Sequence, residues 1–449
     1  MKESRLLRIL DRYVGSFLCF VFSLFRSIRP YRSDVKRVLL IELFEMGASI
    51  MIIPSIRNIL RQYPDAEIYV LTTKGNFSSW DISGLINRNR IICLDGKNFV
   101  SFSLSALQAL VSLRRIGIDL VIDFEKFSRV STIFSVLAGA KRIAGFYRYE
   151  YEGLYRGSRL IDVPCSFNQN AHISQNFLAL TKAALSPETT YPNIKDWISP
   201  EELSLPRFNT SPEQKRLVRQ KLGLSDSDKL VLVCPDVGAN LQVRNYPLNS
   251  FAFVASELLA DDPDRHIAII GVESNRPICD AFERLLCDNR VHNLCGATQS
   301  LEEVIELISI SELIIGNDNG PLHFASLTDT RILGIFSTDS PFMYGPLGEA
   351  VVLYSFFHCS PCISALNHKH SRCSDNRCIQ VIPPEFVAEM ALKLIAGDVQ
   401  TRTINGELPY LLGSTGFNHT EPFVRIRERS RYQDQHRTAI EPRDSSTQA

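Results

Sequence analysis

The sequence lacks an excess of charge of either sign. Its 449 residues include 49 lysines and arginines and 49 aspartates and glutamates, so the formal net charge is zero. Proteins that bind nucleic acid generally carry a net positive charge or a long cationic patch. We therefore expect no nucleic-acid partner.

The sequence also lacks a regular cysteine framework. Its eleven cysteines are an odd number scattered along the chain, whereas a small secreted domain held by disulfides has an even number at compact spacings. No lysine stands in a context that suggests a pyridoxal phosphate site. We expect a protein of the reducing cytoplasm.

Long hydrophobic runs are scarce, and the N-terminal one, residues 14–25, has only 12 residues. A helix that spans a bilayer needs about 20 residues. The run also lacks a small-residue cleavage site, so it does not resemble a signal peptide. Residues 1–37 contain nine basic and three acidic residues, a net of +6. Residues 1–36 are thus expected to form an interfacial helix on anionic lipid, or alternatively a helix packed on the protein body or a dimer contact.

The rest of the chain alternates short apolar runs with amphipathic stretches, which is typical of doubly wound α/β sheets. Expected strands are residues 38–41, 68–71, 120–122, 230–233, 267–270, 313–315 and 331–336. Expected helices are residues 49–61, 127–138, 251–259, 301–310 and 322–327.

Composition divides this pattern into two Rossmann-like domains, residues 37–186 and residues 211–398. Residues 187–210 are rich in proline, serine and asparagine and are expected to form the linker. Residues 399–449 are polar and irregular, so we expect a disordered tail.

The most informative segment is residues 314–348, where an apolar strand runs into a polar turn and then a helix. Pro321 stands where a first-turn proline belongs, and the free N–H groups of such a turn bind phosphate. Asp318, Asn319, Gly320 and His323 are the candidate residues of this anion pocket. The alternative is an ordinary turn in which Asp318 or Asn319 only caps the helix.

Several motifs together resemble one family. The runs DNGPLH at 318–323, SPFMYGPLG at 340–348 and CSPC at 359–362 resemble the C-terminal half of glycosyltransferase family 9. These are heptosyltransferase-like enzymes of bacterial surface-polysaccharide synthesis. Residues 38–72 and 122–146 resemble the family's N-terminal motifs, and the motifs occur in the family's order over residues 38–396.

This resemblance implies a GT-B fold, in which two Rossmann-like domains face a central cleft. The first domain would bind a lipid-linked or polysaccharide acceptor, and the second would bind a nucleotide-sugar donor. The reaction would invert the configuration at the sugar carbon and would require no metal cofactor. It would be a step in the synthesis of a lipopolysaccharide-like glycan. The enzyme would be cytoplasmic, with peripheral contact to the inner membrane.

Donor-binding residues are expected at the carboxyl ends of the second domain's strands. Arg244 lies where the resemblance puts a cationic phosphate contact, and a guanidinium can grip a diphosphate with two hydrogen bonds. Glu273 could accept hydrogen bonds from ribose hydroxyls. The alternative for Arg244 is a side chain exposed to solvent, and the alternative for Glu273 is a carboxylate that only stabilises a helix N-terminus. The family more often has serine or threonine at the place of Asn319.

The acceptor requires a base, and a carboxylate near the cleft is the usual solution. Many members of the family carry an aspartate directly after the turn glycine, whereas this chain has Ala48 there. We therefore rank Glu45 first, Glu125 second and Asp123 third as the catalytic base. The alternative is a catalytically inactive nucleotide-sugar-binding or assembly protein.

A cysteine-rich loop, residues 359–378, is a second departure from a plain Rossmann pattern. Its cysteines, with two histidines among them, are compatible with a structural zinc, but also with disulfides or with reduced thiols packed as small apolar groups. The candidate ligands are Cys359, Cys362, Cys373 and Cys378.

Overall fold

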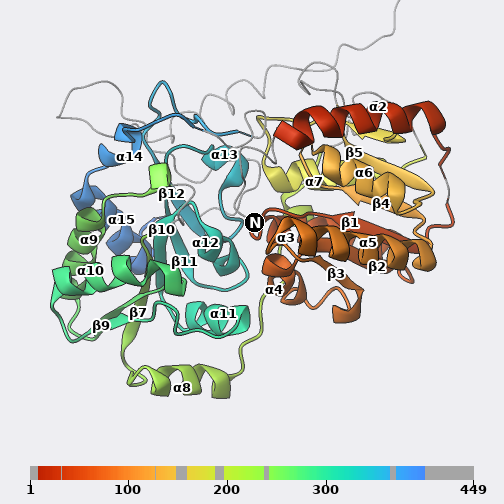
Figure 1. Cartoon of the computed structure of the whole chain (residues 1–449). Coiled ribbons are helices and arrows are strands. Elements are labelled where there is room, and N and C mark those ends of the chain that lie inside the picture. Colours follow the sequence, from red (N-terminus) through yellow and green to blue (C-terminus); the bar gives the residue numbers. More distant parts are fainter. Residues whose placement is uncertain are drawn as a thin grey trace, which may run out of the picture.

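The computed structural model describes residues 9–31, 33–126, 128–147, 159–187, 197–236, 242–364 and 371–399. Two parallel six-stranded sheets lie side by side, and helices cover the faces of each (Figure 1). Both the α/β class and the two doubly wound sheets predicted from the sequence are confirmed.

The first sheet has the strand order β3-β2-β1-β4-β5-β6. Its strands are β1 (Arg37–Ile41), β2 (Glu67–Thr73), β3 (Ile91–Leu94), β4 (Leu120–Asp123), β5 (Arg142–Phe146) and β6 (Val163–Cys165). The helices around it are α2 (Ser16–Phe25), α3 (Ala48–Gln62), α4 (Phe77–Asp81), α5 (Phe99–Ile116), α6 (Arg129–Leu137) and α7 (Ile173–Leu185).

The second sheet repeats this order as β12-β11-β10-β7-β8-β9. Its strands are β7 (Lys229–Cys234), β8 (Arg265–Ile269), β9 (Val291–Asn293), β10 (Leu313–Asn317), β11 (Arg331–Phe336) and β12 (Ala350–Tyr354). The helices of this half are α8 (Pro212–Lys221), α9 (Leu248–Asp261), α10 (Arg276–Leu286), α11 (Leu301–Ser309), α12 (Gly320–Ala325), α13 (Pro341–Tyr344), α14 (Arg377–Gln380) and α15 (Pro384–Ala396).

In both sheets the direction of winding reverses between two neighbouring strands, β1 and β4 in the first and β7 and β10 in the second. Ligands of open α/β sheets bind at such switch points, beyond the carboxyl ends of the strands. The four loops that follow these strands carry nearly all of the candidate site residues.

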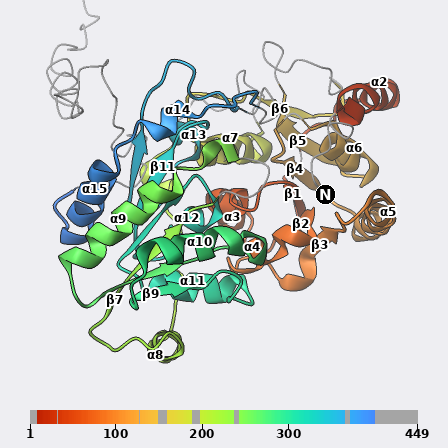
Figure 2. The same cartoon turned by 60° about the vertical axis from the view of Figure 1, so that its left-hand side comes forward.

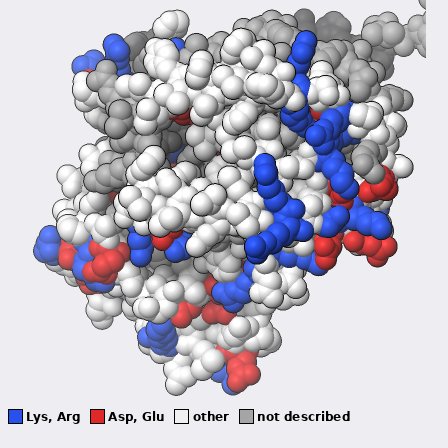
Figure 3. All heavy atoms as spheres, turned by 45° about the vertical axis from the view of Figure 1, so that its right-hand side comes forward, with Lys and Arg blue, Asp and Glu red and all other residues white. Residues whose placement is uncertain are grey.

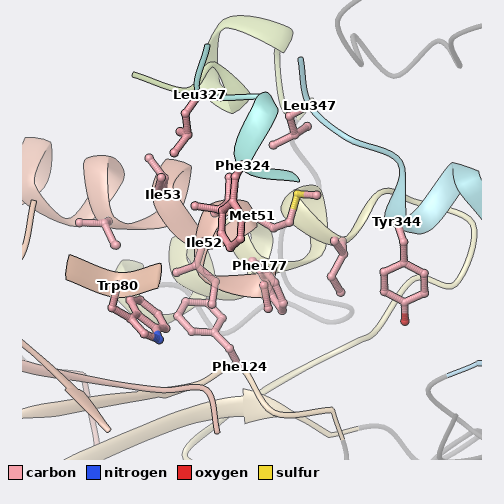
Figure 4. Close-up of a cluster of buried hydrophobic side chains, with 14 of the residues drawn as sticks. Met51, Ile52, Ile53, Trp80, Phe124, Phe177, Phe324, Leu327, Tyr344 and Leu347 are labelled. Atoms are coloured by element: carbon pink, nitrogen blue, oxygen red, sulfur yellow. The ribbon is translucent and has the colours of Figure 1, made fainter. Parts of the chain in front are cut away.

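One apolar core joins the two halves. The first turns of α3, from Ala48 to Ile56, are buried on every side, because one face packs on the first sheet and the other meets the second half of the chain. In Figure 4, Ile53 lies beside Leu327, and Met51 and Ile52 lie beside Phe324. The two sheets are therefore held together by packed side chains beneath the site.

All seven expected strands and all five expected helices are present, with ends shifted by one to three residues. The strands β3, β5, β6, β9 and β12 were not predicted, and neither was the long helix α5. These strands lie toward the edges of their sheets, and β6 and β9 have three residues each. The domain boundaries and the linker stay predictions, and the expected tail lies outside the described residues from position 400 onward.

The expected N-terminal helix is present as α2, preceded by a π-helical turn at Asp11–Gly15. It packs on the protein body, which was one of the alternatives to an interfacial helix. The Asp11 carboxylate accepts hydrogen bonds from the backbone N–H groups of Arg129 and Val130, at the start of α6. At the other end, the Arg26 guanidinium pairs with Asp162 at 2.7 Å.

Candidate active site between the two sheets

A cavity of about 700 Å³ opens between the carboxyl ends of the two sheets. The loop between β1 and α3 forms one wall, with Glu45, Gly47 and Ala48. The opposite wall comes from the second sheet and includes Arg244, Asp318, Asn319, Gly320, His323, Asp339 and Tyr344. The structure thus brings together Glu45 and five of the six predicted donor-site residues.

Arg244 lies at the centre of the second wall and is nearly buried. Its guanidinium contacts the carboxylates of Asp318, at 3.4 Å, and of Asp339, at a shorter distance. The Arg244 Nε atom is buried and has no hydrogen-bond partner among the residues that the structure describes. Two carboxylates hold the guanidinium at the cavity wall, where a bound anion can compete for its N–H groups.

The loop that carries Arg244 is fixed to β10 by Asn317, which is fully buried. The Asn317 amide accepts a hydrogen bond from the Tyr246 backbone N–H and donates one to the Pro235 carbonyl, each at 3.0 Å. The Asn319 amide donates to the Asp236 carbonyl at 3.2 Å. Asn319 therefore ties two loops together, and the backbone N–H groups of α12 remain the anion-binding element of this turn.

The two walls meet most closely at Gly47 and His323. A Cβ atom on Gly47 would lie 2.7 Å from Cδ2 of the His323 ring, which is closer than carbon atoms pack. Only glycine at position 47 therefore allows this approach of the β1 loop to α12.

A second contact between the walls comes from His172, which the sequence reasoning missed. Its Nδ1 accepts a hydrogen bond from the Ser174 N–H at the start of α7, so its Nε2 donates to the Gly345 carbonyl at 2.9 Å. The pKa of His172 is lowered to about 4, mainly by burial; the hydrogen bond with the Gly345 carbonyl opposes this shift, and the nearby His323 contributes to it. The ring is thus neutral and joins the two halves of the chain.

Glu45 faces the cavity and pairs with Lys126, from the loop after β4, at 3.0 Å. Burial by itself would lower the pKa of Lys126, but the interactions of its ammonium with Glu45, Tyr344 and Glu42 are larger in sum and raise the pKa. The Lys126 Nζ also lies 5.3 Å from the centre of the Tyr344 ring, across the cavity. Lys126 directly follows the predicted Glu125 in sequence, and that adjacency was the signal that could have found it.

Asp123 and Glu125 lie behind the cavity wall and are buried. Glu125 accepts a hydrogen bond from the Leu43 N–H at 2.6 Å, and the Ser131 hydroxyl donates to Asp123 at 2.8 Å. Burial and the Glu42 carboxylate raise the pKa of Glu125 well above its usual range. Their catalytic roles stay predictions. Glu125 supports the loop that presents Glu45, and Asp123 supports its own loop by accepting a hydrogen bond from the Glu125 N–H at 3.1 Å.

Glu273 lies beside the cavity and not in its lining, although Val272 and Asn275 are lining residues. Its exposed carboxylate pairs with Arg276 at 2.7 Å, and the Arg276 guanidinium lowers the pKa of Glu273. The predicted ribose contact would require this pair to open, so the role of Glu273 stays a prediction.

Comparison with known proteins identifies the family of the chain. The sequence profile described as glycosyltransferase family 9 (heptosyltransferase) matches residues 108–371, more than half of the chain. The chain belongs to glycosyltransferase family 9. The resemblance stated from the motifs is confirmed.

Individual relatives in this family are distant. Lipopolysaccharide heptosyltransferase 2 of Salmonella typhimurium is 26% identical over 33% of this chain and 43% of that protein, which is less than half of its length. Lipopolysaccharide heptosyltransferase 3 of Escherichia coli is 21% identical over 81% of this chain and 99% of that protein. The structure of the E. coli ADP-heptose lipopolysaccharide heptosyltransferase II matches with a TM-score of 0.61 and 18% identity, over 81% of this chain and 99% of that one. The predicted GT-B fold is thereby confirmed.

The family assignment sharpens the departure at Ala48. This residue begins α3 and lines the cavity, so the position after the turn glycine does face the site. Its methyl group cannot accept a proton. The cavity lining on the β1–α3 side offers one carboxylate, that of Glu45.

The four cysteines of the predicted zinc site all lie within the described residues. The pKa of the buried Cys378 thiol is raised to about 11, first by burial and then by the other three cysteines. Yet within the described ranges no three histidine, cysteine or acidic side chains are placed to hold a metal ion. The two histidines of the loop lie outside these ranges. A structural zinc stays a prediction that this arrangement does not favour.

The first prediction concerns the pH dependence of stability. The pKa of His172 is lower in the folded protein than its ordinary value of 6.5, so the unfolded chain binds more protons between pH 6.5 and 4. The contribution of His172 to the free energy of unfolding is therefore fully present above pH 6.5, and about 3 kcal/mol of it is lost as the pH falls to 4 and below. In His172→Asn, which keeps an N-cap acceptor, denaturant unfolding should lose this part of the pH dependence. The exposed His358→Asn variant should retain it.

The second prediction uses two glycines of the same cavity. In Gly47→Ala the new methyl group meets the His323 ring, whereas a Cβ atom on Gly75 meets nothing within 4 Å. Gly47→Ala should lower the free energy of unfolding by about 1–3 kcal/mol, and Gly75→Ala should leave it nearly unchanged. Equal unfolding midpoints for both variants would show that the two walls do not pack as described.

Proposed function

We propose that this family 9 enzyme is an inverting glycosyltransferase. It would move a sugar, such as a heptose, from a nucleotide-diphosphate donor to a lipid-linked or polysaccharide acceptor of a lipopolysaccharide-like glycan. Transfer would need no bound metal and would occur on the cytoplasmic face of the bacterial membrane. The observation that carries the proposal is the pair of opposed walls, with Arg244 on one and Glu45 on the other.

The second wall suits the donor diphosphate. Arg244 and the first turn of α12 present N–H groups to one region of the cavity, and such donors stabilise the charge that develops on a departing diphosphate. The carboxylates of Asp318 and Asp339 hold the guanidinium in place before the donor arrives. These groups can donate hydrogen bonds to the departing diphosphate.

The first wall suits the acceptor. As the bond between the sugar carbon and the diphosphate breaks, the acceptor oxygen bonds to that carbon and its proton passes to a carboxylate. Lys126 favours the ionised form of Glu45 by its charge. Glu45 is therefore our proposed base, in place of the aspartate that many family members carry directly after the turn glycine, where this chain has Ala48.

Ala48 also supports a second candidate function, a nucleotide-sugar-binding or assembly protein without catalytic activity. Such a protein would keep the second wall and need no base. Release of nucleotide from a donor, dependent on acceptor, separates the two functions.

The third prediction addresses donor binding. A thermal-shift screen over ADP-, GDP-, UDP- and CMP-sugars should find one class that stabilises the protein, by about 2.7 kcal/mol at 100 times its dissociation constant. Arg244→Ala should weaken that binding about 10- to 100-fold, because a charge-assisted hydrogen-bonded contact is lost. Arg265→Ala is the matched control, since Arg265 is a buried arginine that is likewise paired with two carboxylates, those of Asp261 and Glu312. It should reduce stability and leave donor affinity unchanged.

The fourth prediction addresses the base. Glu45→Gln should lower kcat about 10²- to 10⁴-fold while donor affinity is retained, since glutamine still accepts a hydrogen bond from Lys126. Adding Ala48→Asp to this variant should restore part of the rate, because it places a carboxylate at the family's usual position on the same wall.

Full turnover in both Glu45→Gln and Glu125→Gln would refute the assignment of the base. Absence of turnover in the unmodified protein, with tight donor binding and turnover created by Ala48→Asp, would favour the binding function instead.

A further inference from the structure

Three neighbouring helices, α2, α6 and α5, form the flank of the first sheet that faces away from the second. Figures 1 and 2 both show α6 between α2 and α5 on this side of the molecule. Asp11 attaches the N-terminal helix to the first turn of α6. The Arg114 side chain joins α5 to the end of α6 by donating to the Leu137 carbonyl at 2.7 Å. The three helices therefore make one continuous surface, which we call the outer flank.

The outer flank is apolar where it meets solvent. Of the 18 residues of α5 only Ala109 and Leu113 are buried, and the opposite side exposes a stripe at helical spacing. The exposed fractions are 68% for Phe99, 65% for Val100, 59% for Leu104, 61% for Leu107 and 42% for Val111. On α2 they are 64% for Phe17, 52% for Phe20, 61% for Leu24 and 84% for Phe25. A surface helix of a soluble protein normally turns polar residues outward.

Helix α5 needs a separate explanation because it is the one helix, in the described part of the chain, whose length and composition would let it cross a membrane. It connects β3 to β4, which lie in the same parallel sheet, and its buried residues pack on that sheet. Crossing a bilayer would remove it from the fold. Its apolar stripe can instead enter the surface layer of a membrane while the helix stays in place.

Charge on the outer flank is of one sign. None of the three helices contains an aspartate or glutamate, although the whole chain has as many acidic as basic residues. Arg114 and Arg115 are exposed in the last turn of α5, and Arg12 is exposed in the π-helical turn before α2, where the neighbouring Asp11 carboxylate is bound to the start of α6. Figure 3, in which this side of the molecule comes forward, shows broad uncharged areas with basic side chains among them.

We propose that the outer flank docks on an anionic lipid bilayer, with the apolar stripes of α2 and α5 in the surface layer and the arginines on the lipid phosphates. Apolar area and cationic charge together are what such a surface requires. A protein partner would need an acidic counterpart, and a second copy of this chain would bring the same arginines together. The inference deepens the proposed function, because a docked flank would place the cavity beside a lipid-linked acceptor.

The test measures binding of the full chain to vesicles, with neither donor nor acceptor present. Vesicles of phosphatidylethanolamine and phosphatidylglycerol should bind the protein, and phosphatidylcholine vesicles should bind it at least about tenfold more weakly. The double variant Leu104→Gln/Leu107→Gln should lose at least about tenfold in binding to the anionic vesicles. Arg12→Gln/Arg115→Gln should lose a similar factor on anionic vesicles and little on neutral ones.

The matched control is Leu217→Gln/Leu285→Gln, which removes leucines that are 58% and 51% exposed on α8 and α10, away from the flank. It should bind vesicles as the unmodified chain does. The proposal is overturned if the unmodified chain does not bind anionic vesicles, or if control and flank variants lose binding equally. It is also overturned if the chain is a dimer that Leu104→Gln/Leu107→Gln converts to monomers without any change in vesicle binding.

These outcomes are independent of catalysis. Failure of the proposed function would appear as missing donor binding or turnover in a protein that still binds vesicles. Failure of the docking surface would leave donor binding intact in the same preparation.

Discussion

The rest of the structure depends on the packing of α3 between the two sheets. The first turns of this helix are buried on all sides, so the first sheet cannot move relative to α12 without exposing apolar surface. This contact turns the two topological switch points toward each other and leaves a cavity between them. Gly47 sets how close the walls come, and the hydrogen bond from His172 to Gly345 adds a polar contact at the same boundary. The site is therefore a product of how two ordinary doubly wound sheets are joined.

Each charged side chain named at the cavity has a partner of opposite sign. Arg244 pairs with Asp318 and Asp339, while Glu45 pairs with Lys126. Buried charges need partners, because desolvation otherwise costs several kcal/mol. A diphosphate that binds Arg244 would compete with carboxylates that already hold it, and an acceptor hydroxyl would approach a carboxylate already fixed by an ammonium. The site is thus ordered before its ligands arrive, which reduces the reorganisation needed during reaction.

The sequence predicted the fold through local signals, and its failures have physical causes. Central strands such as β1 and β10 are continuous apolar runs because they are buried on both faces, and they were found. The three-residue strands β6 and β9 at the sheet edges carry too little pattern. Glu45, four residues after β1, could be assigned to the cleft from topology. Arg244, ten residues after β7, was assigned through the resemblance to the family. The contacts of Lys126 and His172 depend on tertiary distance, which spacing along the chain does not encode.

The helix α5, which the sequence did not predict, differs from α3 in how its apolar residues are explained. Right-handed connections place α3 on the face of the first sheet toward the second, and α5 and α6 on the opposite face. The apolar character of α3 is explained by burial on both sides, so the fold itself requires it. The outward stripe of α5 has no such explanation, because only Ala109 and Leu113 are needed to seal the sheet. Exposed apolar side chains cost solubility, and their position on a flank without acidic residues is accounted for when that flank faces lipid.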